Sequence, residues 1–86
     1  MIVGFADRGW EDYQYWISND KKIIKRIHLL IKDIQRNPFD RNGLGKPEQL
    51  KANFSGYYSR RITAEHRLVY KILDDLLVIA QCRFHY

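Results

Sequence analysis

The sequence predicts an α+β fold, in which two helices pack on one face of an antiparallel sheet, and three observations predict it. The element signals run in the order strand, helix, helix, strand, strand, strand (β-α-α-β-β-β), so the helices precede a meander of strands. One helix has a continuous apolar face, and the last two strands are separated by a turn of only two residues. With 86 residues, of which 45% are hydrophobic, the chain has room for a single domain, residues 1–86, around one core.

The first two predicted elements are a strand over residues 2–5 and a helix over residues 10–18. Asp7-Arg8-Gly9 separates them as a break that can cap the helix. The periodicity that indicates this helix places Trp10, Tyr13 and Ile17 on one face.

The second predicted helix is the clearest element of the sequence. Asn19-Asp20 is a capping signal at its start. Its apolar residues recur at spacings of three and four, at Ile23, Ile27, Leu30, Ile31 and Ile34. Asn37-Pro38 ends the helix, because the residue before a proline is pushed out of the α region.

The second half of the chain is predicted to form a long loop and three strands. The loop covers residues 38–49, which hold both prolines and two glycines. The strands are predicted over residues 56–62, 66–73 and 76–84. Asp74-Asp75 makes a short turn between the last two strands, which are therefore expected to pair antiparallel.

Strand parity predicts which side chains of these strands face the helices. In the last strand the expected residues are Leu76, Val78, Ala80, Cys82 and Phe84, which form a continuous apolar face. The opposite face becomes polar towards the chain end, where it carries His85. The same parity directs Arg61 and Arg67 away from the helices. We therefore expect Arg61, Arg67 and His85 to share one open, basic surface.

Composition and charge narrow the class of protein. The net charge is +5 and the sequence pI is about 9.5, which favours a polyanionic partner such as nucleic acid. Cys82 is the only cysteine, so no disulfide framework and no Cys-rich zinc site is expected. The N-terminal apolar run is too short for a signal peptide, and no stretch approaches the length of a membrane span. We expect a cytoplasmic protein without a cofactor.

A first functional hypothesis is recognition of RNA phosphates and bases. Cations hold the backbone of single-stranded RNA while aromatic rings stack on its bases. The candidate cations are Lys51, Arg60, Arg61 and Arg67, and the interleaved rings are Tyr57, Tyr58 and Tyr86. The alternative, which the composition leaves open, is that the arginines are solvated and the tyrosines pack as ordinary strand residues.

A second hypothesis is acid–base chemistry by Glu48 and His85 around an arginine. RNA carries its own nucleophile, the ribose 2′-OH, so cleavage needs one group to remove that proton and another to protonate the leaving 5′ oxygen. A guanidinium beside the phosphate would stabilise the transition state. The residues alone favour the plainer alternative, a loop carboxylate paired with a lysine and a disordered terminal histidine, because lone Glu and His residues are common.

Two further features have a functional and a structural interpretation. The second helix carries a basic stripe of Lys21, Lys25, His28 and Lys32, which could contact RNA phosphates or could simply be the solvated face of an amphipathic helix. Glu65 could brace Arg67 by an ion pair or merely occupy a turn. His28 and His66 share no recognisable metal-ligand spacing with other residues.

Five segments occur together in an order that is typical of one family. They are residues 10–13 (WEDY), 45–51 (GKPEQLK), 55–62 (SGYYSRRI), 65–70 (EHRLVY) and 82–86 (CRFHY). With them the chain resembles the YoeB (Txe) toxins of the RelE/ParE superfamily, nearly from end to end. The resemblance implies the RelE-like fold, which agrees with the order of elements derived above.

The resemblance also implies an activity and its residues. Such toxins belong to toxin–antitoxin systems and block translation by cutting mRNA in the ribosomal A site, without a metal. In the family the glutamate matching Glu48 is the general base, the histidine matching His85 is the general acid, and the arginine matching Arg67 stabilises the phosphate. Lys51, Arg61 and Tyr86 match positions that hold or orient the RNA, and Glu65 matches a supporting acidic residue.

The partners that the resemblance implies are an antitoxin, the ribosome with its mRNA, and a second toxin. The antitoxin would be YefM-like, a DNA-binding dimer with an acidic tail that suits the positive charge of this chain. The 30S A site and its rRNA would be the place of action, and a toxin homodimer is a family property. Two alternatives are a ParE-type toxin that inhibits gyrase and a non-catalytic RNA-binding module. Intact Glu48, Arg67 and His85 argue against both.

Overall fold

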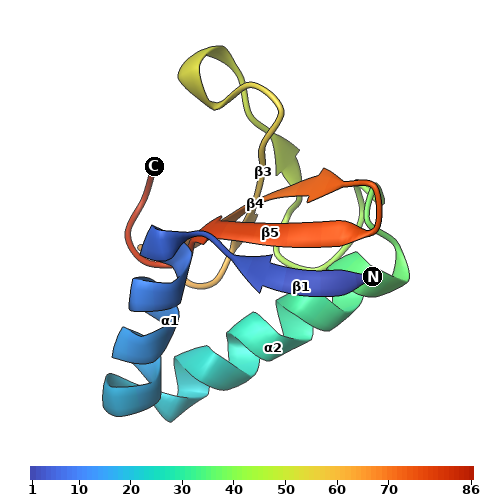
Figure 1. The fold of residues 1–86 in the computed structure, drawn as a ribbon. Helices are drawn as coiled ribbons and strands as arrows, with labels where there is room; N and C mark the ends of the chain where they lie inside the picture. The colour runs from blue at the N-terminus through green and yellow to red at the C-terminus, as the bar shows by residue number, and fades with distance from the viewer.

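Two helices cover one face of a five-stranded sheet in this computed structural model, which describes residues 1–86 (Figure 1). The predicted α+β class and the two-helix layer are thereby confirmed. The elements in chain order are β1 (Ile2–Phe5), α1 (Asp7–Asn19), α2 (Lys21–Arg36), β2 (Glu48–Gln49), the 3₁₀ turn η1 (Ala52–Phe54), β3 (Tyr58–Arg61), β4 (Arg67–Leu73) and β5 (Leu76–Gln81). No helix is both long and apolar enough to cross a membrane.

The sheet differs from the predicted one in two respects. Its strand order is β1-β5-β4-β3-β2, and the meander of β3, β4 and β5 is antiparallel as predicted. Strand β1 adds to the edge of β5 in parallel, so the sheet is mixed. Strand β2 lies within the segment predicted as loop and pairs with β3 over only two residues, Glu48 with Ser59 and Gln49 with Tyr58.

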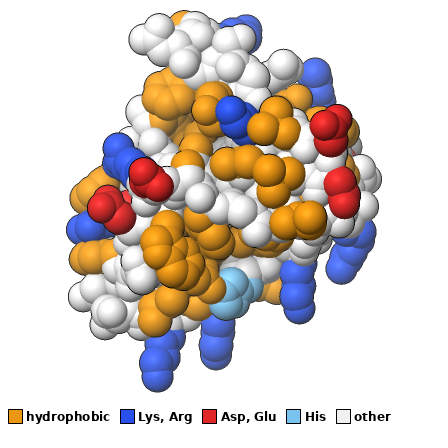
Figure 2. Space-filling view, in the orientation of Figure 1, with side chains coloured by type: hydrophobic (Ala, Val, Ile, Leu, Met, Phe, Trp, Pro, Cys, Tyr) orange, Lys and Arg blue, Asp and Glu red, His pale blue; other side chains and the backbone are white.

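Helix α2 forms as the sequence predicts and supplies one side of the core. The side chain of Asp20 caps it by accepting hydrogen bonds from the backbone N–H groups of Lys22 and Ile23, at 3.0 and 3.3 Å. Residues of α2 that are fully buried against the sheet are Ile27, Leu30 and Ile34. Burial of such a side chain stabilises the fold by about 2 kcal/mol. In Figure 2 basic side chains project from the lower edge of the molecule, where Figure 1 shows the helices.

Helix α1 packs with a different face from the apolar one that its periodicity suggests. Trp10 and Ile17 are about half exposed, whereas the buried residues are Gly9, Asp12 and Trp16. A Cβ atom on Gly9 would lie 2.2 Å from the carbonyl oxygen of Ile79, so only glycine allows this close approach to β5. Tyr13 of the predicted face does pack against the core, but periodicity misses the rest of the contact face because Gly9 and the hydrogen-bonded Asp12 carry no hydrophobic signal.

The predicted faces of β5 are wrong for its first half. Leu77 and Ile79 are buried against the helices, whereas Leu76 and Val78 are only partly buried. Val69 pairs with Gln81 and Tyr70 with Ile79, which leaves Ala80 as an unpaired bulge residue. The extra residue moves the side chains beyond it to the opposite face. Cys82 is therefore buried in the core as predicted, but the strand ends at Gln81 and does not continue to Phe84.

Candidate active site

A hollow of about 500 Å³ lies on the face of β3 and β4 that points away from the helices. Its lining residues are Lys46, Pro47, Glu48, Ser59, Arg61, Arg67, His85 and Tyr86. The structure thus brings together five of the seven residues selected from the sequence. Ser59 and Lys46 were not selected. Ser59 could have been, because it has the same strand parity as Arg61.

Glu48 enters the hollow from β2, the short strand that pairs with β3. Its side chain is exposed, and its Oε2 accepts a hydrogen bond from the hydroxyl of Tyr86 at 3.4 Å. The two residues before Pro47 adopt left-handed backbone conformations, with φ of 80° at Gly45 and 52° at Lys46. The carbonyl oxygen of Gly45 accepts a 2.6 Å hydrogen bond from the backbone N–H of Arg61. The chain therefore turns sharply into β2 and presents Glu48 at the rim of the hollow.

Arg67 lies beside Arg61 on the neighbouring strand and is only 9% exposed. Its Nη1 donates to the carbonyl oxygens of Thr63, Ala64 and His66, at 2.9, 3.1 and 3.2 Å. The side-chain hydrogen bonds of Arg67 all come from Nη1, so Nε and Nη2 make none within the fold, and the residue lines the hollow. A guanidinium held in this way is prepared to bind an anion with little further ordering.

The chain end reaches the hollow through a bend and not as a continued strand. Asp12 accepts a hydrogen bond from the backbone N–H of Cys82 at 3.0 Å, and Trp16 Nε1 donates to the carbonyl oxygen of Cys82 at 2.8 Å. Burial, and secondarily the Asp12 carboxylate, raise the pKa of the Cys82 thiol to about 12. Beyond this anchor the chain bends at Phe84 and delivers His85 into the hollow.

The last two side chains are exposed and lie against each other. The rings of His85 and Tyr86 are 4.7 Å apart between centroids, and Tyr86 also contacts Phe54 at 5.7 Å. Strand parity placed His85 on the face of Arg61 and Arg67, but the strand ends four residues before it. His85 does lie on the same face as Arg61 and Arg67, but strand alternation is not the reason. The bulge at Ala80 and the bend that follows it bring His85 there.

The two remaining selected residues lie outside the hollow. Lys51 lines a neighbouring cavity of about 610 Å³ that shares Glu48 with the hollow and is walled by the aromatic rings of Phe39, Tyr58 and Tyr70. Glu65 is exposed, and no ion pair joins it to Arg67. Its backbone N–H donates to Thr63 Oγ1 in the turn whose carbonyls hold Arg67. Of the two interpretations offered for Glu65, the geometry favours the turn.

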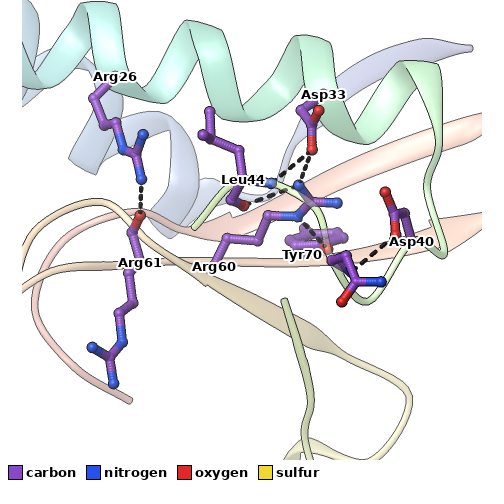
Figure 3. A network of polar contacts seen from close by, with 8 residues as sticks. Arg26, Asp33, Asp40, Leu44, Arg60, Arg61 and Tyr70 are labelled. Atoms are coloured by element: carbon purple, nitrogen blue, oxygen red, sulfur yellow. Dashed lines mark hydrogen bonds and ion pairs between the residues drawn. The ribbon is translucent and has the colours of Figure 1, made fainter. Parts of the chain in front are cut away.

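Arg60 is not available to a ligand, which corrects its selection as a phosphate-binding cation. It is completely buried on the helix side of β3, opposite in parity to Arg61. Figure 3 shows its guanidinium between α2 and the loop before β2, where Nη1 donates to the Asp33 carboxylate and to the carbonyl oxygen of Leu44. Its Nε donates to the hydroxyl of Tyr70 at 3.1 Å.

The pKa values of Asp33 and Tyr70, the two acidic groups that Arg60 contacts, are shifted in this network. The hydrogen bond from Arg60, and then the one from the backbone N–H of Leu44, hold the pKa of Asp33 below its ordinary value. Desolvation raises the pKa of Tyr70, and its hydrogen bond to Arg60 opposes the rise only in part. A Cβ atom on Gly43 would lie 2.7 Å from Asp33 Oδ2 and 2.8 Å from Arg60 Nη1, so a larger residue at this position would have to displace the ion pair.

The geometry of the hollow suits a phosphate with proton-transfer groups at its sides. Arg61 and Arg67 supply positive charge, and Glu48 and His85 supply a carboxylate and an imidazole. No group of three or more His, Cys, Asp or Glu side chains is placed to hold a metal ion.

Comparison with known proteins gives one consistent result over the whole chain. A family model described as "YoeB-like toxin of bacterial type II toxin-antitoxin system" matches residues 5–86. Toxin YoeB of Synechocystis is 60% identical over the full chain and 98% of the relative, and Toxin YoeB of Escherichia coli K12 is 57% identical over the full length of both. Among solved structures, a YoeB/ParE toxin from Agrobacterium tumefaciens has a TM-score of 0.94 at 45% identity, with both chains fully covered.

A second solved structure, a heterotetrameric YoeB–YefM complex from Staphylococcus aureus, matches with a TM-score of 0.90 at 50% identity over 100% of this chain and 98% of the other. Fold and neighbours define a toxin of the RelE-like class. The chain belongs to the YoeB family of toxins of bacterial type II toxin–antitoxin systems.

Proposed function

We propose that this toxin is a ribosome-dependent endoribonuclease that cleaves mRNA in the A site and thereby inhibits translation. The observation that carries the proposal is the hollow that gathers a carboxylate, an imidazole and two arginines on one open face. The resemblance of the sequence to the YoeB toxins supplies the substrate, since the hollow itself indicates only an anion near two groups that can transfer protons.

In the proposed reaction Glu48, as the ionised base, removes the proton of the ribose 2′-OH. The O2′ atom attacks the adjacent phosphorus, forming a 2′,3′-cyclic phosphate, while the bond from phosphorus to the 5′ oxygen breaks. His85, as the protonated acid, donates its proton to that leaving oxygen. Arg67, whose position three backbone carbonyls fix, offsets the negative charge that develops on the phosphate oxygens.

The other residues selected from the sequence bind or orient the RNA, directly or by supporting Arg67. Arg61 adds a second cation within the hollow, and Lys51 extends the positive charge into the neighbouring cavity. Tyr86 offers a ring for base stacking, and its hydroxyl contacts the Glu48 carboxylate. Glu65 supports the turn that carries the carbonyl partners of Arg67.

The proposed partners are the ribosome with its mRNA, a YefM-like antitoxin, and a second copy of the toxin. Solved structures similar to this chain include YoeB–YefM complexes and a YoeB dimer from Staphylococcus aureus. The net charge of +5 suits both RNA and an acidic antitoxin segment.

The test is primer extension on a translated message after expression without antitoxin. Wild type is expected to cut the message only when ribosomes engage it, and Glu48→Ala and His85→Ala are each expected to lower cleavage by about 10²–10⁴-fold. Glu11→Ala, which removes an exposed glutamate from α1, serves as the control and should cleave as wild type does. Cleavage by His85→Ala at the wild-type rate would remove His85 from the acid role. Absence of cleavage by wild type, together with a supercoiling defect, would instead indicate a gyrase target.

A further inference from the structure

The backbone of Phe84 is held at both ends by two consecutive residues of the chain. Its N–H donates a 2.7 Å hydrogen bond to Nδ1 of His66, and its carbonyl oxygen accepts a 3.0 Å hydrogen bond from the N–H of Arg67. The His66 ring itself is fixed edge-on against buried Trp16, at 4.8 Å between centroids, and it also contacts the Phe84 ring at 5.8 Å.

Phe84 needs such a hold because its conformation is unfavourable. Its φ of 64° lies in the left-handed region, which a bulky aromatic residue rarely adopts unless its surroundings impose it. The bend at this residue turns the chain from the anchor at Cys82 towards the hollow. Beyond it, the only hydrogen bond from the last two residues to the rest of the fold is the 3.4 Å contact of Tyr86 with Glu48.

The direction of the hydrogen bond fixes the chemical form of His66. A backbone N–H can only donate, so Nδ1 of His66 must be unprotonated to accept it. The proton of the neutral ring then resides on Nε2. His66 therefore acts here as an acceptor with a defined tautomer and not as a proton donor.

We propose that His66 is a positioning residue, which holds the Phe84 bend through Nδ1 and so keeps His85 and Tyr86 over the hollow beside Arg67. The inference rests on the proposed function, since it concerns the placement of the group assigned as general acid. Displacement of a reacting group by about 1 Å can lower a rate by about 100-fold. Loss of the acceptor should therefore reduce kcat strongly and KM little, because Arg61 and Arg67 still bind the phosphate.

Two substitutions separate the hydrogen bond from the packing of the ring. His66→Asn keeps an acceptor, because the asparagine Oδ1 occupies nearly the place of Nδ1, but it loses the ring. His66→Phe keeps an aromatic ring against Trp16 but loses the acceptor. Ile34→Val, which removes a methylene from the core at helix α2 without touching the His66 hydrogen bond, reports the effect of lowered stability.

The first measurement is the rate of ribosome-dependent cleavage at saturating and at limiting concentrations of message, which gives kcat and KM separately. His66→Phe is expected to lose about 100-fold in kcat, whereas His66→Asn and Ile34→Val stay within about threefold of wild type. The reverse order, with His66→Asn impaired and His66→Phe active, would overturn the proposal and assign His66 to packing.

The second measurement does not depend on activity and separates failure of this inference from failure of the proposed function. By NMR, the Phe84 amide should exchange slowly and His85 and Tyr86 should be ordered in wild type and in His66→Asn. In His66→Phe the protection should disappear and the last two residues should become mobile. A chain end that stays ordered in His66→Phe overturns the inference. If wild type cleaves no RNA but the NMR pattern is as expected, the positioning role stands and the proposed function fails.

Discussion

The buried guanidinium of Arg60 ties helix α2 to the loop that carries Glu48. It has no exposed surface, and its hydrogen bonds reach Asp33 on α2, Leu44 on the loop and Tyr70 on β4 (Figure 3). Its Nη2 is buried without a partner, which makes the ion pair with Asp33 the main compensation for burying the charge. Removing the carboxylate charge would leave a buried cation that is poorly compensated.

The charge of Asp33 should therefore appear in the pH dependence of stability. Because the folded-state pKa of Asp33 is below its ordinary value of 3.8, its contribution is complete above about pH 4 and is lost as pH falls through the folded pKa. Asp33→Asn should cost about 3 kcal/mol at pH 7, and less as the pH falls below 4. Urea unfolding of both proteins between about pH 7 and pH 3 measures the difference. A difference that stays constant over this range would assign the loss to hydrogen-bond geometry instead of charge.

At the scale of elements, periodicity predicted helix α2 and the antiparallel meander because apolar side chains recur at regular spacings on their buried faces. The same signal failed where other chemistry makes the contact. Helix α1 approaches β5 through Gly9 and the hydrogen-bonded Asp12, and a bulge at Ala80 reverses the faces of β5. Neither a close backbone approach nor an unpaired residue leaves a hydrophobic pattern in the sequence.

The sequence predicts those site residues whose own side chains would contact the substrate. It does not predict a residue such as His66, whose side chain holds the backbone of another residue. Glu48, Arg67 and His85 were found from their chemistry and from the family motifs. For His66 the sequence shows only that no metal-ligand spacing is present, because its hydrogen bond to a residue eighteen positions away depends on tertiary structure. Arg60 and Arg61 look equivalent in the sequence, and only strand parity separates the buried cation from the available one.

Helix α2 carries a basic stripe on its solvent side, and its members have different environments. Lys21, Lys25 and Lys32 are exposed and form no ion pair, whereas His28 Nε2 contacts the Tyr13 hydroxyl at 2.7 Å. Basic side chains project from this edge of the molecule in Figure 2. The lysines are therefore the part of the stripe that is free to contact phosphates.

Replacing these three lysines by glutamine tests whether the stripe contacts ribosomal RNA. The triple variant should bind ribosomes more weakly. A plot of the logarithm of the association constant against the logarithm of the salt concentration should be less steep, with a slope smaller in magnitude by about 2, because fewer counterions are released. Ribosome pelleting over a range of salt concentrations measures both quantities. Glutamine at Lys22, which is also exposed on α2 but outside the stripe, is the control. If the affinity and the slope are unchanged, the stripe is an ordinary solvated helix face and does not contact ribosomal RNA.

At the scale of the whole molecule, positive charge is present on both sides of the fold. The hollow presents Lys46, Arg61 and Arg67 on the sheet face that points away from the helices, and the lysines of α2 occupy the opposite side. Under the proposed function the toxin would meet RNA on more than one side, and positive charge on both sides would attract it in more than one orientation. The same field would attract an acidic antitoxin segment, so the rate of neutralisation should depend on total charge.

The association rate of the toxin with a YefM-like antitoxin is therefore expected to fall with ionic strength. Between about 50 mM and about 500 mM salt, kon should decrease about tenfold while koff changes much less, because screening weakens long-range attraction more than contacts within the complex. Stopped-flow fluorescence can follow the reaction through the two tryptophans of the toxin. The triple lysine variant lowers the net charge by three without altering the hollow, so it should associate more slowly at low salt and match wild type at high salt. If kon were equal for both proteins at every salt concentration, the association rate would depend only on contacts within the interface. Long-range electrostatic attraction by the lysines of α2 would then make no contribution.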